Sequence, residues 1–239
     1  GRCAVASAPS PHPPVRALRP ARTSPHSGPH VVDRKAPTAM QLVIGNKNYS
    51  SWSMRPWALM RGLGIPFEEK KLSFLLGMGG GFRDAMLKIS PAARVPVLID
   101  GELTVWDSLA IAEYLHERFP DKGVWPRSLP ARTRARSLCA EMHSGFAALR
   151  THCPMNVEAS LPEAGRRALS EQPLVRRDIE RIDQMWSDAL AQVGPAAKDG
   201  GGPFLFGAFS AADAYFAPVA LRVRTYALPL SPASAAYAE

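Results

Sequence analysis

A cluster of serines lies where a helix is predicted to begin. The segment Ser50-Ser51-Trp52-Ser53-Met54-Arg55 follows a short apolar strand predicted at 41–45 and leads into a helix predicted over about 54–62. The first turn of a helix has unpaired N–H groups and the positive end of the helix dipole, so it favours a bound anion or thiolate. A serine hydroxyl there can donate a further hydrogen bond to such a ligand. The segment therefore predicts a small-molecule site, with Ser53 expected to cap the helix.

A cation and a proline precede the next apolar strand. Arg94-Val95-Pro96 introduces a strand predicted at 96–99. A proline at this place cannot donate to the sheet ladder, so the Val95–Pro96 bond is a candidate cis peptide that would turn the Val95 backbone toward a ligand. Arg94 is either a carboxylate contact or a solvated loop charge.

An acidic residue and a serine open a further helix. Asp100-Gly101 predicts a hairpin into a strand at 102–105, and Asp107-Ser108 then begins a helix predicted over 108–118. Asp107 suits a helix N-cap and a contact to a ligand amino group, and both roles can hold together. We expect these residues and the serine cluster to form one site.

The order of elements after Met40 indicates two kinds of domain. The predicted strands are 41–45, 68–72, 96–99 and 102–105, and the predicted helices are about 54–62, 82–89 and 108–118. This is a βαβ unit followed by ββα. Residues 40–120 are therefore expected to form an α/β domain.

A helical pattern replaces the strands after Pro120. Residues 121–130 are expected to be a linker, and apolar side chains then recur at helical spacing. The two series are Ala135, Leu138, Met142, Phe146 and Leu149, and Val175, Ile179, Ile182, Trp186 and Val193. Ser210 and Asp213 resemble a capping box, and 234–239 resemble the start of another helix. We expect an all-helical domain over 131–239, cut short at its C-terminus.

The first 39 residues differ in composition from the rest. They hold six Lys or Arg against one Asp and eight prolines, so they account for +5 of the net charge of +8. Such a segment buries too little apolar surface to offset chain entropy, which predicts a disordered basic tail. No aromatic residues interleave with its arginines, so a solvated tail is favoured over a nucleic-acid arm. Met40 is a candidate natural start.

Composition restricts the class of protein. The chain has 239 residues with 46% hydrophobic content, enough for a substantial core. No apolar run approaches the roughly 20 residues of a membrane span. Its three cysteines have no metal-ligand spacing, and His116, His143 and His152 stand singly, so no metal site is expected. We expect a soluble cytoplasmic protein with no membrane or nucleic-acid partner.

In this order, the motifs resemble the glutathione S-transferase family over nearly all of residues 40–239. The Ser-x-x-Ser-x-Arg pattern at 50–55 resembles the active-site segment of serine-type classes, above all zeta and tau. Arg94-Val95-Pro96-Val97-Leu98 resembles the cis-proline strand of the family, and Asp107-Ser108 its acidic-serine pair. The resemblance implies a thioredoxin-like N-terminal domain that binds glutathione and an all-helical C-terminal domain.

The resemblance also implies roles for single residues. The serine five positions before Arg55 is Ser50, which would be catalytic, with Ser51 and Ser53 as fallbacks. The implied glutathione contacts are Ser51, Arg94, Val95, Pro96, Asp107 and Ser108. Because no cysteine lies between 46 and 55, the cysteine-type classes are not favoured.

The predicted activity is glutathione conjugation or isomerisation of a small electrophile, in a homodimeric detoxification enzyme. Glutathione is the expected co-substrate, and the serine is a hydrogen-bond donor to its thiolate, not a nucleophile. Maleylacetoacetate-like isomerisation is one variant. The alternative is a non-catalytic glutathione-transferase-like module that binds glutathione or a protein.

Two further features lead to separate expectations. Arg55 lies in the first turn of a helix, where a cation is unfavourable, so a specific acidic partner is expected. Residues 77–81 are rich in glycine but lack the pattern of a phosphate loop, so a flexible loop is expected there.

Overall fold

The computed structural model of this protein describes residues 39–73, 81–193 and 202–239. The predicted tail, except Ala39, and residues 77–80 of the glycine-rich segment lie outside the described residues. Gly81 is described and begins a helix.

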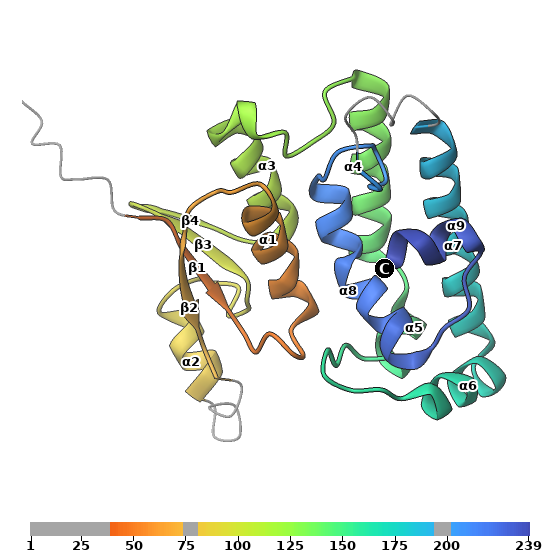
Figure 1. Ribbon diagram of the computed structural model, residues 1–239. Coiled ribbons are helices and arrows are strands. Elements are labelled where there is room, and N and C mark those ends of the chain that lie inside the picture. The colour runs from red at the N-terminus through yellow and green to blue at the C-terminus, as the bar shows by residue number, and fades with distance from the viewer. Residues whose placement is uncertain (1–38, 74–80, 194–201) are drawn as a thin grey trace, which may run out of the picture. The chain divides into compact units, whose positions relative to one another are not determined.

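A four-stranded mixed sheet organises the first part of the described chain (Figure 1). The strands are β1 (Gln41–Ile44), β2 (Glu68–Lys71), β3 (Val97–Asp100) and β4 (Leu103–Val105), in the spatial order β2-β1-β3-β4. The β1 strand runs parallel to β2 and antiparallel to β3, and β3 pairs antiparallel with β4. The predicted βαβ and ββα units are therefore present.

Helices cover both faces of the sheet. Side chains alternate between the two faces along a strand, so β1 places apolar side chains on each face. The covering helices are α1 (Ser51–Gly62), α2 (Gly81–Leu87) and α3 (Ser108–Arg118). Leu42 and Ile44 point into the main core that includes α1 and α3, whereas Val43 points the other way, to Met86 of α2. Figure 1 shows α1 and α3 on one side of the sheet and α2 on the other.

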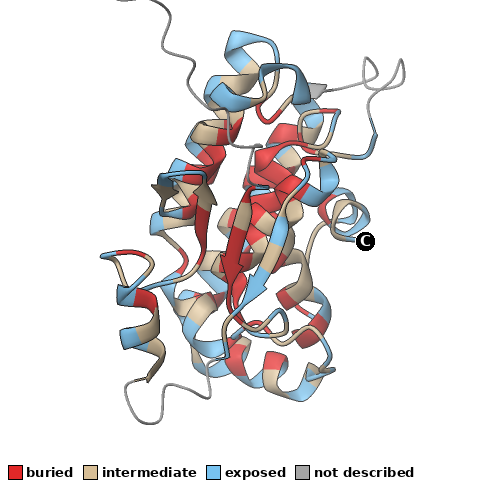
Figure 2. Ribbon diagram, turned by 90° about the vertical axis from the view of Figure 1, so that its left-hand side faces the viewer, coloured by how far each residue is buried: buried red, intermediate tan, exposed pale blue. Residues whose placement is uncertain are grey.

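The second part of the chain is helical, as predicted. Its elements are the 3-10 turn η2 (Pro120–Lys122) and the helices α4 (Leu129–Ser144), α5 (Ala147–His152), α6 (Pro162–Glu171), α7 (Pro173–Val193), α8 (Ala211–Tyr226) and α9 (Pro232–Ala238). The α8 helix packs on α1, α4 and α6, and the large rings of Trp186 and Phe216 meet edge to face in the core. Figure 2 shows the buried residues along the central strands and on packed helix faces.

Several predicted boundaries are wrong. The first helix begins at Ser51, not near residue 54, and α2 spans 81–87, not 82–89. The stretch expected to be a linker contains the end of η2 and the start of α4. Phe146 does not continue the helix of Met142, because α4 ends at Ser144 and Phe146 adopts a left-handed conformation at φ 59° before α5.

Other local predictions are confirmed. The Val95–Pro96 bond is cis, and Gly101 has φ 59° in the hairpin between β3 and β4. Ser210 and Asp213 form the capping box at the start of α8, and α9 follows near the C-terminus. No described helix is long and apolar enough to cross a membrane.

A close approach between α6 and the end of α8 depends on Gly165. A Cβ atom there would lie 1.9 Å from the Tyr226 carbonyl oxygen, which is backbone and cannot rotate away. We expect Gly165→Ala to lower the free energy of unfolding by about 2–3 kcal/mol, because the helices must separate. Chemical denaturation measures this, and Arg167→Ala on the exposed face of α6 should change it by less than about 0.5 kcal/mol. Equal stability of both variants would contradict the prediction.

Candidate functional site

One cavity collects most of the residues that the sequence singles out. It has a volume of about 460 Å³ and is lined by Ser50, Trp52, Phe82, Arg94, Val95, Asp107 and His143. These residues come from α1 and the residue before it, α2, the segment before β3, the start of α3, and α4. We call this cavity the serine pocket. The structure thus brings Ser50, Arg94, Val95 and Asp107 together, as predicted.

Ser50 occupies the N-cap position of α1 and is 8% exposed. Its carbonyl oxygen accepts the Met54 N–H at 3.1 Å, but its hydroxyl does not cap the helix. The Ser50 Oγ instead donates to the Ser53 Oγ at 2.8 Å. The hydroxyl therefore lies at the positive end of the α1 dipole, and the Ser50 side chain forms part of the pocket wall.

Ser53 has a different role from the predicted helix cap. It is the third residue of α1, and its Oγ accepts the Gly45 N–H at 3.1 Å as well as the Ser50 hydroxyl. Because α1 begins three residues earlier than predicted, Ser53 lies within the first turn and ties that turn to the end of β1. The expectation that Ser53 caps the helix is wrong.

Besides Ser53, three of the named residues do not line the serine pocket. Ser51 is buried and its Oγ accepts the Arg222 Nη2 at 3.4 Å. Pro96 is buried at the entry to β3. Ser108 is 1% exposed. Burial raises the pKa of the neighbouring Tyr215, and the Ser108 hydroxyl opposes this rise in part. Their side chains belong to the packed layer behind the pocket.

Asp107 is the N-cap of α3 and also lines the serine pocket. Its Oδ1 accepts the Leu109 N–H at 3.0 Å, and its Oδ2 lies 3.1 Å from the His143 Nε2. The side chain is 52% exposed, so one carboxylate both caps the helix and faces the cavity. The two roles that the sequence left open for Asp107 are therefore geometrically compatible.

His143 is the titratable residue of the pocket that sequence reasoning missed, and Phe82 is a further lining residue that it did not name. It lies on α4, and its ring meets Trp52 edge to face at 4.9 Å between centroids. No local motif surrounds it, because its partner Asp107 begins a helix in the other part of the chain. Only the packing of α4 near α3 brings the two together.

Arg55 has no acidic partner among the described residues, contrary to expectation. It is 1% exposed, and its guanidinium carbon lies 4.2 Å from the centroid of the Trp52 ring and 4.8 Å from that of Tyr215. Its pKa is lowered to about 10, mainly by burial and in smaller part by nearby Arg150 and Arg222. Aromatic faces thus take the place of a carboxylate, since ring quadrupoles attract cations.

Arg55, Arg150 and Arg222 form a positive cluster behind the serine pocket. Arg150 also stacks on Trp52, at 4.9 Å, and Arg222 reaches Ser51. Burial lowers the pKa of Arg222 to about 10, yet all three remain cations near pH 7. Their charges and the α1 dipole give this end of the pocket a positive potential, which favours an anion.

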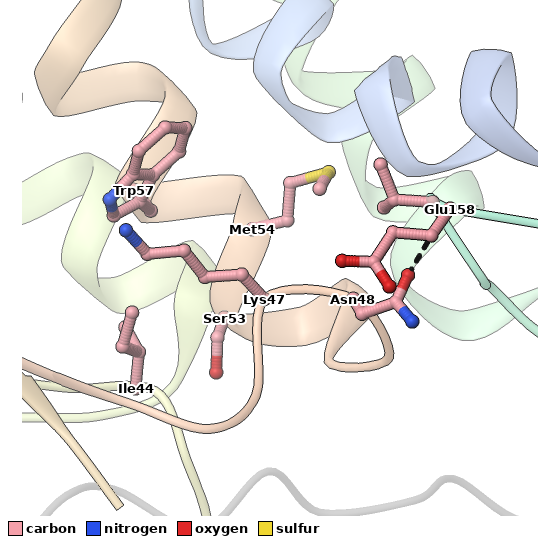
Figure 3. Close-up of a pocket in the computed structure, with 8 residues that line it drawn as sticks. Ile44, Lys47, Asn48, Ser53, Met54, Trp57 and Glu158 are labelled. Carbon is pink, nitrogen blue, oxygen red and sulfur yellow. Dashed lines mark hydrogen bonds between the residues drawn. The ribbon is translucent and has the colours of Figure 1, made fainter.

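A second cavity, of about 270 Å³, is lined by Ser53 among other residues (Figure 3). Its apolar wall is made of Ile44, Met54, Trp57 and Val157. Its polar groups are largely engaged with protein partners: Lys47 pairs with Glu69 at 2.8 Å, and the Asn48 side chain accepts the Glu158 N–H at 3.0 Å. It lacks the convergent charged groups of the serine pocket, so the serine pocket is the candidate functional site.

No metal site is found in the described parts of the chain. No group of three or more His, Cys, Asp or Glu side chains is placed to hold an ion among residues 39–73, 81–193 and 202–239. The functional groups that line the serine pocket are a hydroxyl, a guanidinium, a carboxylate and an imidazole.

The fold and pocket define a thioredoxin-like domain joined to a helical domain. Residues 46–123 match the family model of the glutathione S-transferase N-terminal domain. The matched residues make up about a third of the chain.

Two curated relatives match parts of the chain. The dichloromethane dehalogenase of Methylorubrum extorquens is 43% identical over 68 residues, which are 28% of this chain and 23% of the relative. The zeta-class glutathione S-transferase of Euphorbia esula is 35% identical over 93 residues, or 39% of this chain and 40% of the relative. The chain thus spans less than half the length of these two relatives.

A solved structure extends the likeness of fold beyond the N-terminal domain. A bacterial zeta-class glutathione S-transferase, described as maleyl pyruvate isomerase, superposes with a TM-score of 0.58 at 23% identity. The match covers 83% of this chain and 89% of that protein. The predicted fold, a thioredoxin-like domain followed by a helical one, is confirmed.

Proposed function

We propose that this chain is a serine-type glutathione transferase that activates the glutathione thiolate through Ser50. The observation that carries the proposal is the convergence of Ser50, Arg94, Val95 and Asp107 on one pocket. These four residues lie in the segment 46–123, which matches a glutathione S-transferase N-terminal domain. The proposed reaction is conjugation of glutathione to a small electrophile.

The chemistry requires a hydroxyl that stabilises a thiolate. A thiol with a pKa near 8.5 is mostly protonated at pH 7, so donors and positive charge must favour its anion. The Ser50 hydroxyl now donates its hydrogen bond to Ser53, and it can turn to donate to the glutathione sulfur instead. The Ser53 hydroxyl can then donate a hydrogen bond to the Ser50 Oγ. The Gly45 N–H keeps Ser53 in place during this exchange. The sulfur then forms a C–S bond with the electrophilic carbon, and the leaving group departs with the electron pair of the bond that breaks.

The remaining groups of glutathione need matching partners. We assign the glycyl carboxylate to Arg94, the cysteinyl backbone to Val95, and the α-ammonium group of the γ-glutamyl end to Asp107. The γ-glutamyl carboxylate would meet backbone N–H groups at the start of α3, where Ser108 is buried. Ser51 and Pro96 support this arrangement from behind the pocket, as residues of its packed layer.

A second reaction is favoured by the positive cluster. The buried Arg55 and Arg222 and the half-buried Arg150 suit an electrophile that carries carboxylates, such as a cis diacid isomerised by transient addition of glutathione. The zeta-class likeness is consistent with this class of substrate.

We also propose a homodimer, since Leu103 and Trp106, at and just after β4, are 56% and 41% exposed.

The direct test is calorimetric titration of the full chain with glutathione, followed by turnover of a chloronitrobenzene. Binding with turnover supports the proposed enzyme. Binding without turnover of chloronitrobenzene or a maleyl-type diacid would favour a non-catalytic glutathione-binding module. Absence of binding would refute the assignment of the serine pocket.

Arg94 provides a separate prediction about affinity. We expect Arg94→Ala to raise the Kd for glutathione about tenfold or more, because a charge-assisted hydrogen bond to the glycyl carboxylate contributes about 1.5–3 kcal/mol. Calorimetry of the variant measures this. Arg83→Ala serves as the matched control, because Arg83 is exposed on α2 and does not line the pocket. An unchanged Kd in Arg94→Ala would show that Arg94 does not bind the glycyl carboxylate and is a solvated loop charge.

A further inference from the structure

The Asp107–His143 pair joins two parts of the chain at the mouth of the serine pocket. Asp107 begins α3, and His143 is in the last turn of α4. The His143 Nε2 lies 3.1 Å from the Asp107 Oδ2, and the Leu109 N–H holds the other carboxylate oxygen. Both side chains line the cavity. The orientation of the Asp107 carboxylate is therefore fixed from two sides.

The surroundings of His143 favour its neutral form. Burial lowers the pKa of His143, Asp107 at the start of α3 opposes this, and Arg55 of α1 and Arg150 of α5 lower it further. Near pH 7 the ring is thus uncharged, and its Nε2 atom lies 3.1 Å from the Asp107 Oδ2, a distance at which a hydrogen on Nε2 can be donated to the carboxylate. The Nδ1 atom is buried and has no hydrogen-bond partner among the residues that the structure describes.

We propose that His143 is a positioning residue that orients the Asp107 carboxylate toward the α-ammonium group of glutathione and weakens this contact when it takes up a proton. The inference rests on the proposed function, because it assigns the amino end of glutathione to Asp107. It adds a residue from the helical part of the chain to the recognition of glutathione.

A neutral donor suits this role better than a cation. A lysine or arginine at His143 would cancel the negative charge that attracts the ammonium group, whereas a neutral imidazole orients the carboxylate and leaves its charge intact. Protonation removes this advantage, because it adds a positive charge beside Asp107. The proton and the ligand therefore compete, and by linkage each lowers the affinity for the other by the same factor.

The test uses S-methylglutathione, which has no thiol to titrate. Between pH 5.5 and 7 its carboxylates stay ionised and its amine stays largely protonated. We expect the Kd of the wild-type chain to rise about three- to tenfold as the pH falls from 7 to 5.5. His143→Gln keeps an N–H donor for Asp107 but cannot take up the proton, so its Kd should match the wild type at pH 7 and stay flat.

Two matched controls separate this effect from general acid sensitivity. His152→Gln changes an exposed histidine at the end of α5 and should keep the wild-type pH dependence. An S-methylglutathione analogue that lacks the α-amino group should bind more weakly at pH 7, with a Kd that does not rise on acidification. Circular dichroism at both pH values checks that each protein stays folded.

The outcomes distinguish this inference from the proposed function. No binding of S-methylglutathione at pH 7 would refute the proposed function itself. Binding whose pH dependence persists in His143→Gln would overturn the role of His143 alone. If His143→Gln does not fold, Asp107→Asn replaces it and should bind more weakly at pH 7 with a flat profile. In wild-type protein, the NMR titration midpoint of His143 should fall on saturation with ligand, and an unchanged midpoint would also overturn the inference.

Discussion

Replacing Ser50 by alanine should reduce kcat/KM for glutathione conjugation by about 10²–10³-fold, with a Kd for glutathione that changes much less. This is the usual loss when one donor to a developing or stabilised anion is removed, about 3–4 kcal/mol. The reason is local, because Ser50 is the serine that lines the pocket at the N-cap of α1. Steady-state kinetics and calorimetry measure the two quantities, and ultraviolet titration of the bound thiolate should show a raised thiol pKa.

The other serines serve as comparisons for this result. Ser53→Ala should lower kcat/KM only about tenfold, because it removes the partner of Ser50 but not the donor to sulfur. Ser137→Ala, on the exposed face of α4, should leave the activity unchanged. If Ser50→Ala keeps full activity while Ser51→Ala or Ser53→Ala loses it, the catalytic assignment moves to that serine.

The largest expected effect on stability comes from Asp213→Ala. Asp213 is 5% exposed, and its Oδ1 accepts the Leu205 N–H at 3.0 Å and the Tyr237 hydroxyl at 3.1 Å. Its Oδ2 accepts the Ser210 N–H at 2.9 Å and the Ser210 hydroxyl at 3.1 Å. Alanine would leave these buried donors unpaired. We expect a loss of about 3–4 kcal/mol in the free energy of unfolding, or a fall of about 10 °C in Tm.

Denaturant unfolding tests this prediction with two companions. Asp213→Asn keeps one acceptor oxygen and should lose about half as much stability. Asp121→Ala, on the exposed turn η2, should lie within about 0.5 kcal/mol of the wild type. A loss below about 1 kcal/mol in Asp213→Ala would show that the capping box is not required for the joint between α8, α9 and the segment before α8.

Local patterns in the sequence are sufficient to predict much of the fold. Apolar residues at 42–44 indicate a buried strand, Asp100-Gly101 indicates a hairpin, and Ser210 with Asp213 indicates a helix start. Each depends on neighbours within a few residues, so a single chain segment contains the information. The sequence determines element boundaries less well. The α1 helix begins at Ser51 because the Ser50 carbonyl accepts the Met54 N–H, and the backbone carbonyl of a neighbouring residue could have accepted the first helical hydrogen bond in the same way.

The candidate site divides in the same way between sequence and structure. The sequence by itself determined which residues are candidates, because Ser50, Arg94, Val95 and Asp107 belong to local motifs at strand and helix ends. Only the tertiary structure decided that they share a pocket, that Ser51, Pro96 and Ser108 lie behind it, and that His143 joins Asp107. It also gave Arg55 aromatic partners instead of an acid. The physical reason is that burial and pairing across distant segments depend on how helices pack, which no local spacing encodes.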